Sequence, residues 1–121
     1  MGVVEKRKFR RVKTHNLISY VCLDNDGRPI TNLMGIALDI SQGGLLLETT
    51  QRIEPQDIVL VAADEKERIV EIKAKAVYCR EVSSGKFHVG VNFLGTHDEN
   101  IQFAKCVVRA YHYRKISGKP S

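Results

Sequence analysis

The chain has 121 residues, 43% of them hydrophobic, and a formal net charge of +5. That length fits one compact domain with a modest core and is too short for two. No apolar run is long enough to cross a bilayer, and a basic cluster beginning at residue 6 is not the layout of a secretory signal. We therefore expect a single domain in the cytoplasm.

The positive charge is concentrated at the two ends of the chain. Residues 1–13 carry six basic side chains and one acidic one, and residues 105–121 carry five basic side chains and no acidic one. Residues 14–104 carry eight basic and thirteen acidic side chains. Any anion-binding surface must therefore be built mainly from the termini.

Short runs rich in Val, Ile and Leu fill the middle of the chain, separated by Asp-Gly, Gly-Gly and Ser-Ser-Gly. This punctuation predicts a mostly antiparallel β domain. The strands are expected at 16–23, 31–40, 44–50, 57–63, 70–78 and 87–93, the last two forming a hairpin.

The strand at 70–78 has the clearest alternation of the chain. Val70, Ile72, Ala74, Ala76 and Tyr78 share one face, which we expect to be buried, and the other face is mostly charged. Tyr78 would offer an aromatic surface to a base, but its place on the apolar face predicts a structural role.

The period changes after residue 95. Thr96 to Glu99 form a capping-box sequence, and Ile101, Ala104 and Val108 then recur at helical spacing. Phe103, Val107 and Ala110 widen the apolar face. We expect a helix at roughly 98–114 that packs across the sheet or closes one end of a barrel. The chain then divides into a basic arm (1–13), a β domain (14–95), a helical segment (96–115) and a disordered tail (116–121).

Two segments interrupt the β pattern. The first is the basic stretch at 6–13, in which Arg7 and Arg11 lie four residues apart. It is either a solvated tail or an anion clamp, since arginine offers a planar fork of donors to a phosphate or to the edge of a guanine.

The second segment, residues 38–45, joins two strands. Asp39 and Ser41 can cap backbone N–H groups there, and Gly43 or Gly44 can adopt positive φ. The same residues can serve a ligand instead, because a carboxylate accepts hydrogen bonds from guanine and glycine allows close backbone approach. The segment alone leaves both interpretations open.

Taken together, the two segments resemble the PilZ family, whose pattern is R-x-x-x-R in an N-terminal arm followed by [D/N]-x-S-x-x-G at a turn. Here these are Arg7 to Arg11 and Asp39 to Gly44, in that order. Residues 89–94 (Val-Gly-Val-Asn-Phe-Leu) resemble the family's late strand, and a helix follows. The resemblance covers about 5–112.

The resemblance implies a six-stranded antiparallel β-barrel with a C-terminal α-helix, a flexible basic N-terminal arm, and cyclic di-GMP as the ligand. Arg7 and Arg11 would grip phosphate and guanine, Asp39 and Ser41 would hydrogen-bond a guanine, and Gly44 would keep the turn clear of it. Secondary contacts are expected from Lys6, Arg10 and Gly43. The chain departs from many members at Lys6, where they have arginine, and at Arg10, where they have proline, which bears on whether one ligand or a stacked pair binds.

The function implied is that of a bacterial cyclic di-GMP receptor or adaptor whose arm becomes ordered on ligand binding. It would signal to a partner protein in motility, pilus, biofilm or exopolysaccharide control. The alternatives are a ligand-independent PilZ-like adaptor and a non-specific nucleic-acid-binding module. The latter is less favoured, because aromatic residues make up only 7% of the chain and no RNA-binding aromatic motif occurs.

No catalytic or metal site is expected. The histidines are scattered without metal-ligand spacing, and Ser41 lies in no nucleophile-elbow sequence. The three cysteines, Cys22, Cys79 and Cys106, are odd in number and lie among apolar neighbours. We interpret them as small buried hydrophobic residues, and not as disulfide partners or metal ligands.

Overall fold

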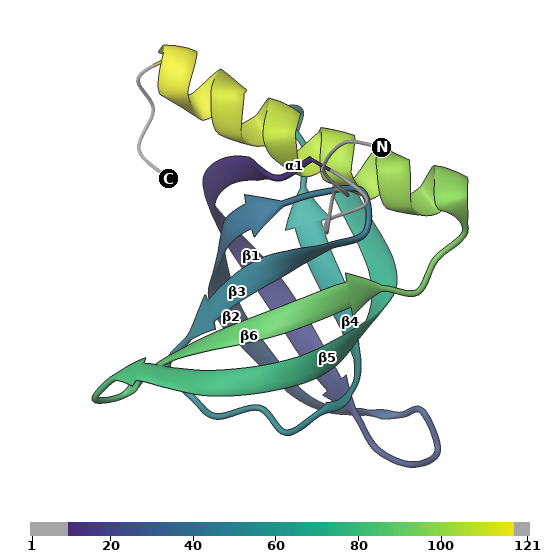
Figure 1. The fold of residues 1–121 in the computed structure, drawn as a ribbon. Coiled ribbons are helices and arrows are strands. Elements are labelled where there is room, and N and C mark those ends of the chain that lie inside the picture. Colours follow the sequence, from purple (N-terminus) through teal and green to yellow (C-terminus); the bar gives the residue numbers. More distant parts are fainter. Residues whose placement is uncertain (1–9, 118–121) are drawn as a thin grey trace, which may run out of the picture.

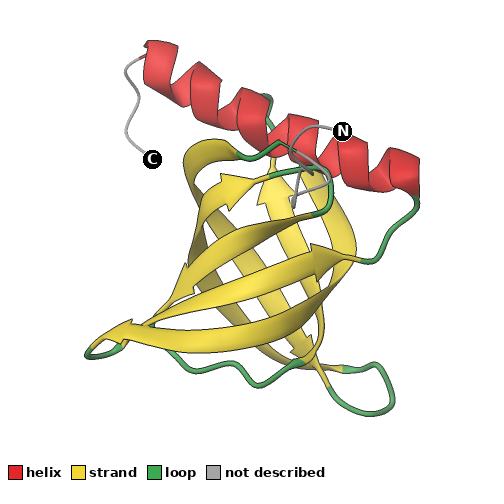
Figure 2. Ribbon diagram, viewed as in Figure 1, coloured by secondary structure: helices red, strands yellow, loops and turns green. Residues whose placement is uncertain are grey.

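The computed structural model describes residues 10–117, which form six β-strands and one helix (Figures 1 and 2). The chain-order elements are β1 Val12–Leu23, β2 Pro29–Ile40, β3 Gly44–Thr49, β4 Gln56–Ala63, β5 Ile69–Ser83, β6 Lys86–Phe93 and α1 His97–Ser117. The predicted fold class, a six-stranded antiparallel barrel with a C-terminal helix, is confirmed. The expected arm overlaps β1 at residues 12 and 13, α1 extends to residue 117, and residues 1–9 and 118–121 lie outside the described range.

The strands close into a barrel in the order β1-β2-β3-β6-β5-β4, and every neighbouring pair is antiparallel. β5 and β6 form the predicted hairpin, and Gly85 in its turn has φ +74°. Because β1 pairs with β2 on one side and β4 on the other, the sheet has no free edge at that seam.

The inward faces of all six strands supply one apolar core. Its largest fully buried side chains include Tyr20, Ile18, Leu45, Leu47 and Leu60. Each such side chain contributes about 1.5–3 kcal/mol when it is removed from water. The core is therefore the main source of stability, and the outer face of the barrel is free for other roles.

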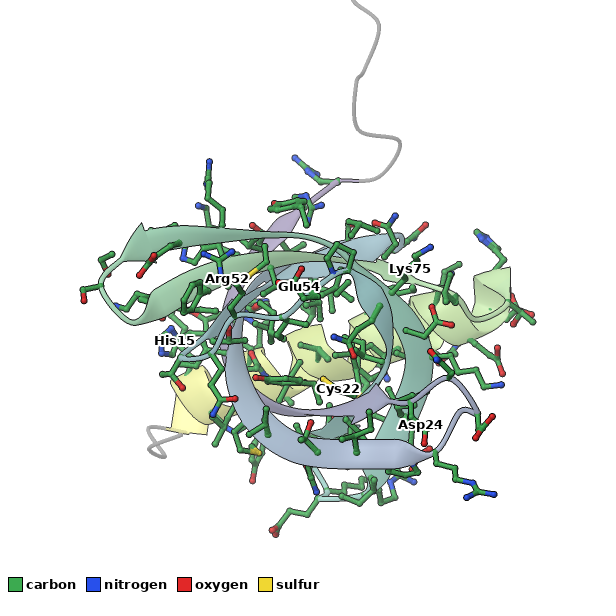
Figure 3. The ribbon with its side chains drawn as sticks, turned by 90° about the horizontal axis from the view of Figure 1, so that it is seen from below. His15, Cys22, Asp24, Arg52, Glu54 and Lys75 are labelled. Atoms are coloured by element: carbon green, nitrogen blue, oxygen red, sulfur yellow. The ribbon has the colours of Figure 1, made fainter. Side chains whose placement is uncertain are left out.

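Helix α1 covers one end of the barrel (Figure 1), and Figure 3, which looks from the opposite end, shows it behind the strands. Phe103 and Val107 of this helix are buried, and the centroid of the Phe103 ring lies 5.5 Å from that of Phe93 in an edge-on contact. The Asn16 side chain donates to the Val107 carbonyl at 3.3 Å, which ties β1 to the helix. Of the two expected arrangements, packing across the sheet or closing one end of a barrel, the structure has the second.

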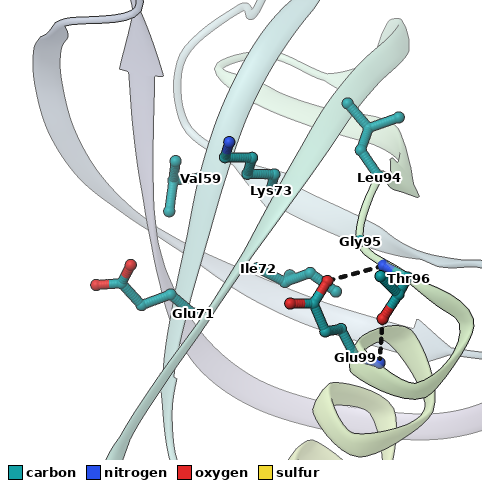
Figure 4. Close-up of a pocket in the computed structure, with 8 residues that line it drawn as sticks. All are labelled: Val59, Glu71, Ile72, Lys73, Leu94, Gly95, Thr96 and Glu99. Atoms are coloured by element: carbon teal, nitrogen blue, oxygen red, sulfur yellow. Dashed lines mark hydrogen bonds between the residues drawn. The ribbon is translucent and has the colours of Figure 1, made fainter.

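The predicted capping box forms at the start of α1 (Figure 4). The Thr96 N–H donates to Glu99 Oε1 at 2.8 Å, and the Glu99 N–H donates to Thr96 Oγ1 at 3.2 Å. Two backbone donors that the first turn would leave unpaired are thereby satisfied. This local signal places the helix start within one residue of the sequence-based estimate.

The predicted burial of Tyr78 is wrong. A register shift between Ala76 and Tyr78 inserts an extra residue into β5, so Val77 and Tyr78 are both exposed and Tyr78 keeps 50% of its surface. A bulge of this kind changes which face the following side chains occupy. Tyr78 therefore lies on the outer face of the barrel.

All three cysteines are free thiols in the structure. Cys106 is buried, and burial raises the pKa of its thiol. Cys22 and Cys79 are only partly buried and pack against the core. Among residues 10–117, no group of three or more His, Cys, Asp or Glu side chains is placed to hold a metal ion.

Candidate functional site

The turn between β2 and β3 is held by Ser41. Its N–H donates to the Gly44 carbonyl at 2.8 Å, and its hydroxyl accepts from the Gly43 N–H at 3.1 Å. The same hydroxyl lies 3.4 Å from the Gly44 carbonyl oxygen, to which it donates. Ser41 is buried. Its side chain thus fixes the shape of the turn that carries the candidate motif.

The two glycines of this turn do not have positive φ, so that expectation is wrong; in the described chain the glycines with positive φ are Gly27 and Gly85. Gly44 is required for another reason. A Cβ there would lie 2.0 Å from the Val91 carbonyl oxygen of β6. The Gly43 carbonyl meanwhile accepts from the Phe93 N–H at 2.9 Å. Close packing of the turn on β6 therefore explains Gly44 without a ligand.

Arg11 and Asp39 are brought together by the pairing of β1 with β2. Arg11 immediately precedes β1, Asp39 lies one residue before the end of β2, and Lys13 pairs with Asp39 in register. Arg11 Nη1 donates to Asp39 Oδ1 at 2.6 Å, and the two side chains are 33% and 19% exposed. The structure thus joins one residue from each predicted motif. Arg7 and Lys6 lie outside the described residues, and Arg10 is exposed.

A row of outward-facing residues runs from Asp39 across three strand pairs. Asp39 pairs with Leu46, Leu46 with Gly90, and Gly90 with Tyr78. Paired residues of antiparallel strands project to the same face, and neighbouring strands are about 4.8 Å apart. Asp39 and Tyr78 are therefore at opposite ends of one row that spans β2, β3, β6 and β5.

Gly90 leaves room for a neighbouring ring in this row because it has no side chain. A Cβ at Gly90 would lie 2.1 Å from Cε2 of Tyr78, so the tyrosine ring rests directly over the glycine. One face of the ring is packed on the strand. Since Tyr78 is half exposed, its remaining surface is open to solvent. Gly90 and Tyr78 together form an aromatic platform.

Cationic groups lie near both ends of the row. Arg11 and Lys13 are beside Asp39. On β5, Lys75 and Arg80 are exposed on either side of Tyr78, with Lys75 marked in Figure 3. Arg80 pairs in register with His88, whose Nε2 lies 3.1 Å from Glu48 Oε2. The outer face around the row can attract an anion with a flat aromatic part.

A different pocket, of about 400 Å³, lies between β5 and the start of α1 (Figure 4). Its lining residues include two acidic side chains, Glu71 and Glu99, and one basic side chain, Lys73. Its Thr96 and Glu99 side chains are already engaged in the helix cap. This pocket is less suited to an anion than the row that begins at Asp39.

The comparisons with known proteins bear on this arrangement. A family model described as the PilZ domain matches residues 5–109. The chain belongs to the PilZ domain family. No protein with a curated description matches its sequence. In the described part of this PilZ chain, no helix is long and apolar enough to cross a membrane.

Solved structures of other proteins share the fold. The PilZ domain of YcgR from Escherichia coli, solved with c-di-GMP, aligns with a TM-score of 0.58 at 14% identity and covers 96% of this chain and 100% of that one. The inhibitor of motility MotI/DgrA from Bacillus subtilis aligns at 0.62 with 13% identity, covering 97% and 55%. MrkH of K. pneumonia, in complex with c-di-GMP, aligns at 0.62 with 19% identity, covering 95% and 56%. The chain therefore spans a whole YcgR domain but about half of MotI and MrkH.

Gly90 was not singled out from the sequence, and Tyr78 was expected in a structural role on the buried face. Gly90 interrupts an apolar strand, and a glycine inside a strand often marks a close approach, so a signal was present. The orientation of Tyr78 had no such signal, because the bulge after Ala76 leaves no distinctive residue in the sequence. The platform appears only when β5 and β6 are paired.

Proposed function

We propose that this PilZ domain is a cyclic di-GMP receptor that acts as an adaptor for a partner protein. The observation that carries the proposal is the Arg11–Asp39 ion pair, which places an arginine of the arm against the motif turn at the end of the outward-facing row. Solved relatives support it, since YcgR and MrkH structures contain c-di-GMP. PilZ domains are receptor and adaptor domains, not enzymes.

Arg11, together with Arg7, would bind a phosphate and the O6/N7 edge of a guanine through the planar guanidinium fork. Asp39 would accept from guanine N1–H and N2–H₂. Ser41 keeps one hydroxyl lone pair beyond its two contacts in the turn, which would accept from the ligand. Lys6, Arg10 and Gly43 would add secondary contacts, and Gly44 allows the turn to pack on β6.

The far end of the row gives the ligand a second point of contact. Cyclic di-GMP has two guanines, and the row extends over three strand spacings of about 4.8 Å each from Asp39 to Tyr78. One base would be held at Asp39 while the other stacks on the Tyr78 ring. Stacking of a base on an aromatic side chain contributes about 1–3 kcal/mol.

Ligand binding would order the arm and create the signal. Residues 1–13 carry six basic side chains and one acidic one, and a dianionic ligand would offset part of their mutual repulsion. Charge-assisted hydrogen bonds to two phosphates would then fix the arm over the row. A partner in motility, pilus, biofilm or exopolysaccharide control would recognise the ordered arm.

Calorimetric titration with cyclic di-GMP at moderate salt tests the proposal, with GTP and a short oligonucleotide as competitors. We expect saturable binding that neither competitor displaces, and loss of binding in Arg7→Ala/Arg11→Ala. Arg28→Ala is the matched control, because Arg28 lies in the turn at the opposite end of the barrel. Binding to all nucleic acids without preference would favour the nucleic-acid module, and no heat with any of them would favour a ligand-independent adaptor.

A further inference from the structure

A groove of about 370 Å³ separates α1 from the start of β1 and the motif turn. Its floor is apolar and consists of Val12, Ile40, Ile101, Ala104 and Val108. Val12 is 36% exposed, and Ile101 and Val108 are only partly buried, although Val108 packs against the core. The floor therefore presents apolar surface that the domain itself leaves in contact with water.

The rim of this groove is basic. Arg10, Lys105 and Arg109 line it, and all three are exposed. Lys105 and Arg109 are four residues apart on α1, so they project from the same side of the helix. No carboxylate occurs among the lining residues, although residues 14–104 as a whole have more acidic than basic side chains. The groove thus combines an apolar floor with a positive border.

This combination favours one class of occupant. A nucleic acid would use the cations, but the lining includes no aromatic side chain on which bases could stack, and the apolar floor offers nothing to a sugar-phosphate backbone. The basic stretch at residues 6–8 of this chain has the same sign as the rim and would be repelled. An amphipathic helix with an apolar face and acidic flanks matches both the floor and the rim.

We propose that the groove between α1 and the motif turn docks an acidic amphipathic helix of a partner protein. Lining residues Arg10 and Val12 flank Arg11, and Ser41 and Gln42 belong to the motif turn, so the wall of the groove is continuous with the candidate ligand site. Ligand contacts at Arg11 and Ser41 would shift this wall and change the affinity for the partner. That coupling, unlike the docking itself, rests on the proposed function.

The test uses a defined probe and the full chain labelled with ¹⁵N. The probe is a fluorescein-labelled peptide of about 14 residues, long enough for the roughly 12 Å between Ile101 and Arg109 at the helical rise of about 1.5 Å per residue. It carries leucine at helical spacing and glutamate elsewhere, and the control peptide replaces every glutamate with lysine. We expect amide shifts confined to the groove for the acidic peptide and none for the basic one.

Variants decide whether the rim charges act as proposed. Lys105→Glu/Arg109→Glu should weaken binding of the acidic peptide by at least about fivefold, since two ion pairs become repulsive. Arg28→Glu/Arg52→Glu, which reverses charges in the β1–β2 and β3–β4 connections at the other end of the barrel, should leave the affinity for the acidic peptide unchanged. The first variant should still bind cyclic di-GMP, which separates a failure of docking from a failure of the receptor function.

Three results would overturn the docking site: no groove shifts at millimolar peptide, equal binding of the basic peptide, or displacement of the acidic peptide by a short oligonucleotide. Concentration-dependent groove shifts without peptide would assign the surface to a second copy of the chain instead. If docking holds, saturating cyclic di-GMP should change the peptide affinity by about fivefold or more. An unchanged affinity would contradict the coupling alone.

Discussion

Arg11 and Asp39, 28 residues apart in the sequence, meet in an ion pair of 2.6 Å on the outer face of the barrel. Both side chains retain part of their exposure, so the pair contributes only about 1 kcal/mol or less to folding. The pair matters for the proposed ligand site, because it holds a guanidinium group and a carboxylate at one end of the row that leads to Tyr78.

The first prediction concerns this pair. Asp39→Ala removes a charged acceptor for guanine, and a hydrogen bond to a charged group is worth about 1.5–3 kcal/mol, so affinity for cyclic di-GMP should fall at least about tenfold. Arg11→Lys keeps the charge but loses the planar guanidinium and its paired donors, so it should cause a smaller loss of affinity. Calorimetry gives the affinities, and thermal unfolding should show little change for either variant. A large loss of stability would assign the pair a structural role instead.

The second prediction concerns the aromatic platform. Tyr78→Ala should weaken cyclic di-GMP binding by about 1–3 kcal/mol, and Tyr78→Phe should retain most of the affinity because the ring is kept. The variants are compared in the same calorimetric titration, with Val77→Ala as the control, since Val77 is the exposed neighbour in β5. Equal affinity of Tyr78→Ala and the unaltered protein would exclude stacking at this position.

The third prediction tests the packing of the platform. Gly90→Ala places a Cβ against the Tyr78 ring and should cost about 1–3 kcal/mol in the free energy of unfolding. Adding Tyr78→Ala removes the ring and should recover part of that loss. Gly44→Ala, whose Cβ would meet the Val91 carbonyl of the backbone, should cost at least as much and should not be rescued. Urea unfolding of the three single variants and of the two double variants that combine Tyr78→Ala with Gly90→Ala or Gly44→Ala measures these differences, and additive effects at positions 90 and 78 would contradict the contact.

The fold was largely predictable because its signals are local. Six apolar runs predicted the six strands. Thr96 and Glu99 predicted the start of the helix, since a capping box depends on residues three apart. The candidate site was predictable only in part. Its motif residues were named from sequence, but the contact between Arg11 and Asp39 requires the register of β1 on β2. The exposure of Tyr78 depends on a bulge that arises from strand pairing, and the need for Gly44 arises from β6.

The fourth prediction concerns a turn that the barrel uses twice. Asp24 and Asp64 each accept hydrogen bonds from the backbone N–H groups two and four residues later. The third residue after each aspartate has a positive φ, which is 79° at Gly27 and 64° at Glu67. Glu67 is strained there, so Glu67→Gly should stabilise the protein by up to about 1 kcal/mol. Gly27→Ala, whose Cβ meets nothing within 4 Å, should destabilise it by about 1 kcal/mol through strain alone. Destabilisation by Glu67→Gly in urea unfolding would refute this account.

The fifth prediction is a pH dependence at the second of these turns. The Arg68 backbone N–H, with further donors from the Arg68 guanidinium and the Lys66 N–H, holds the pKa of Asp64 below its usual value. The pKa is lower in the folded state, so the stabilisation is full above the unfolded-state pKa and is lost as the pH falls through the folded one. Asp64→Asn should therefore lower the melting temperature at pH 7, and the difference should shrink as the pH falls below about 4. A difference that is constant with pH would contradict a role for the carboxylate charge.

The location of the ligand site is tested most directly by an ¹⁵N NMR titration of the full chain with cyclic di-GMP. We predict saturable shifts concentrated at Arg11, Asp39, Ser41, Gly90 and Tyr78, with no comparable change at the Asp24 turn at the opposite end of the barrel. Absence of shifts at high ligand concentration would contradict the receptor function. Saturable shifts elsewhere, with the row from Asp39 to Tyr78 unaffected, would contradict the proposed site.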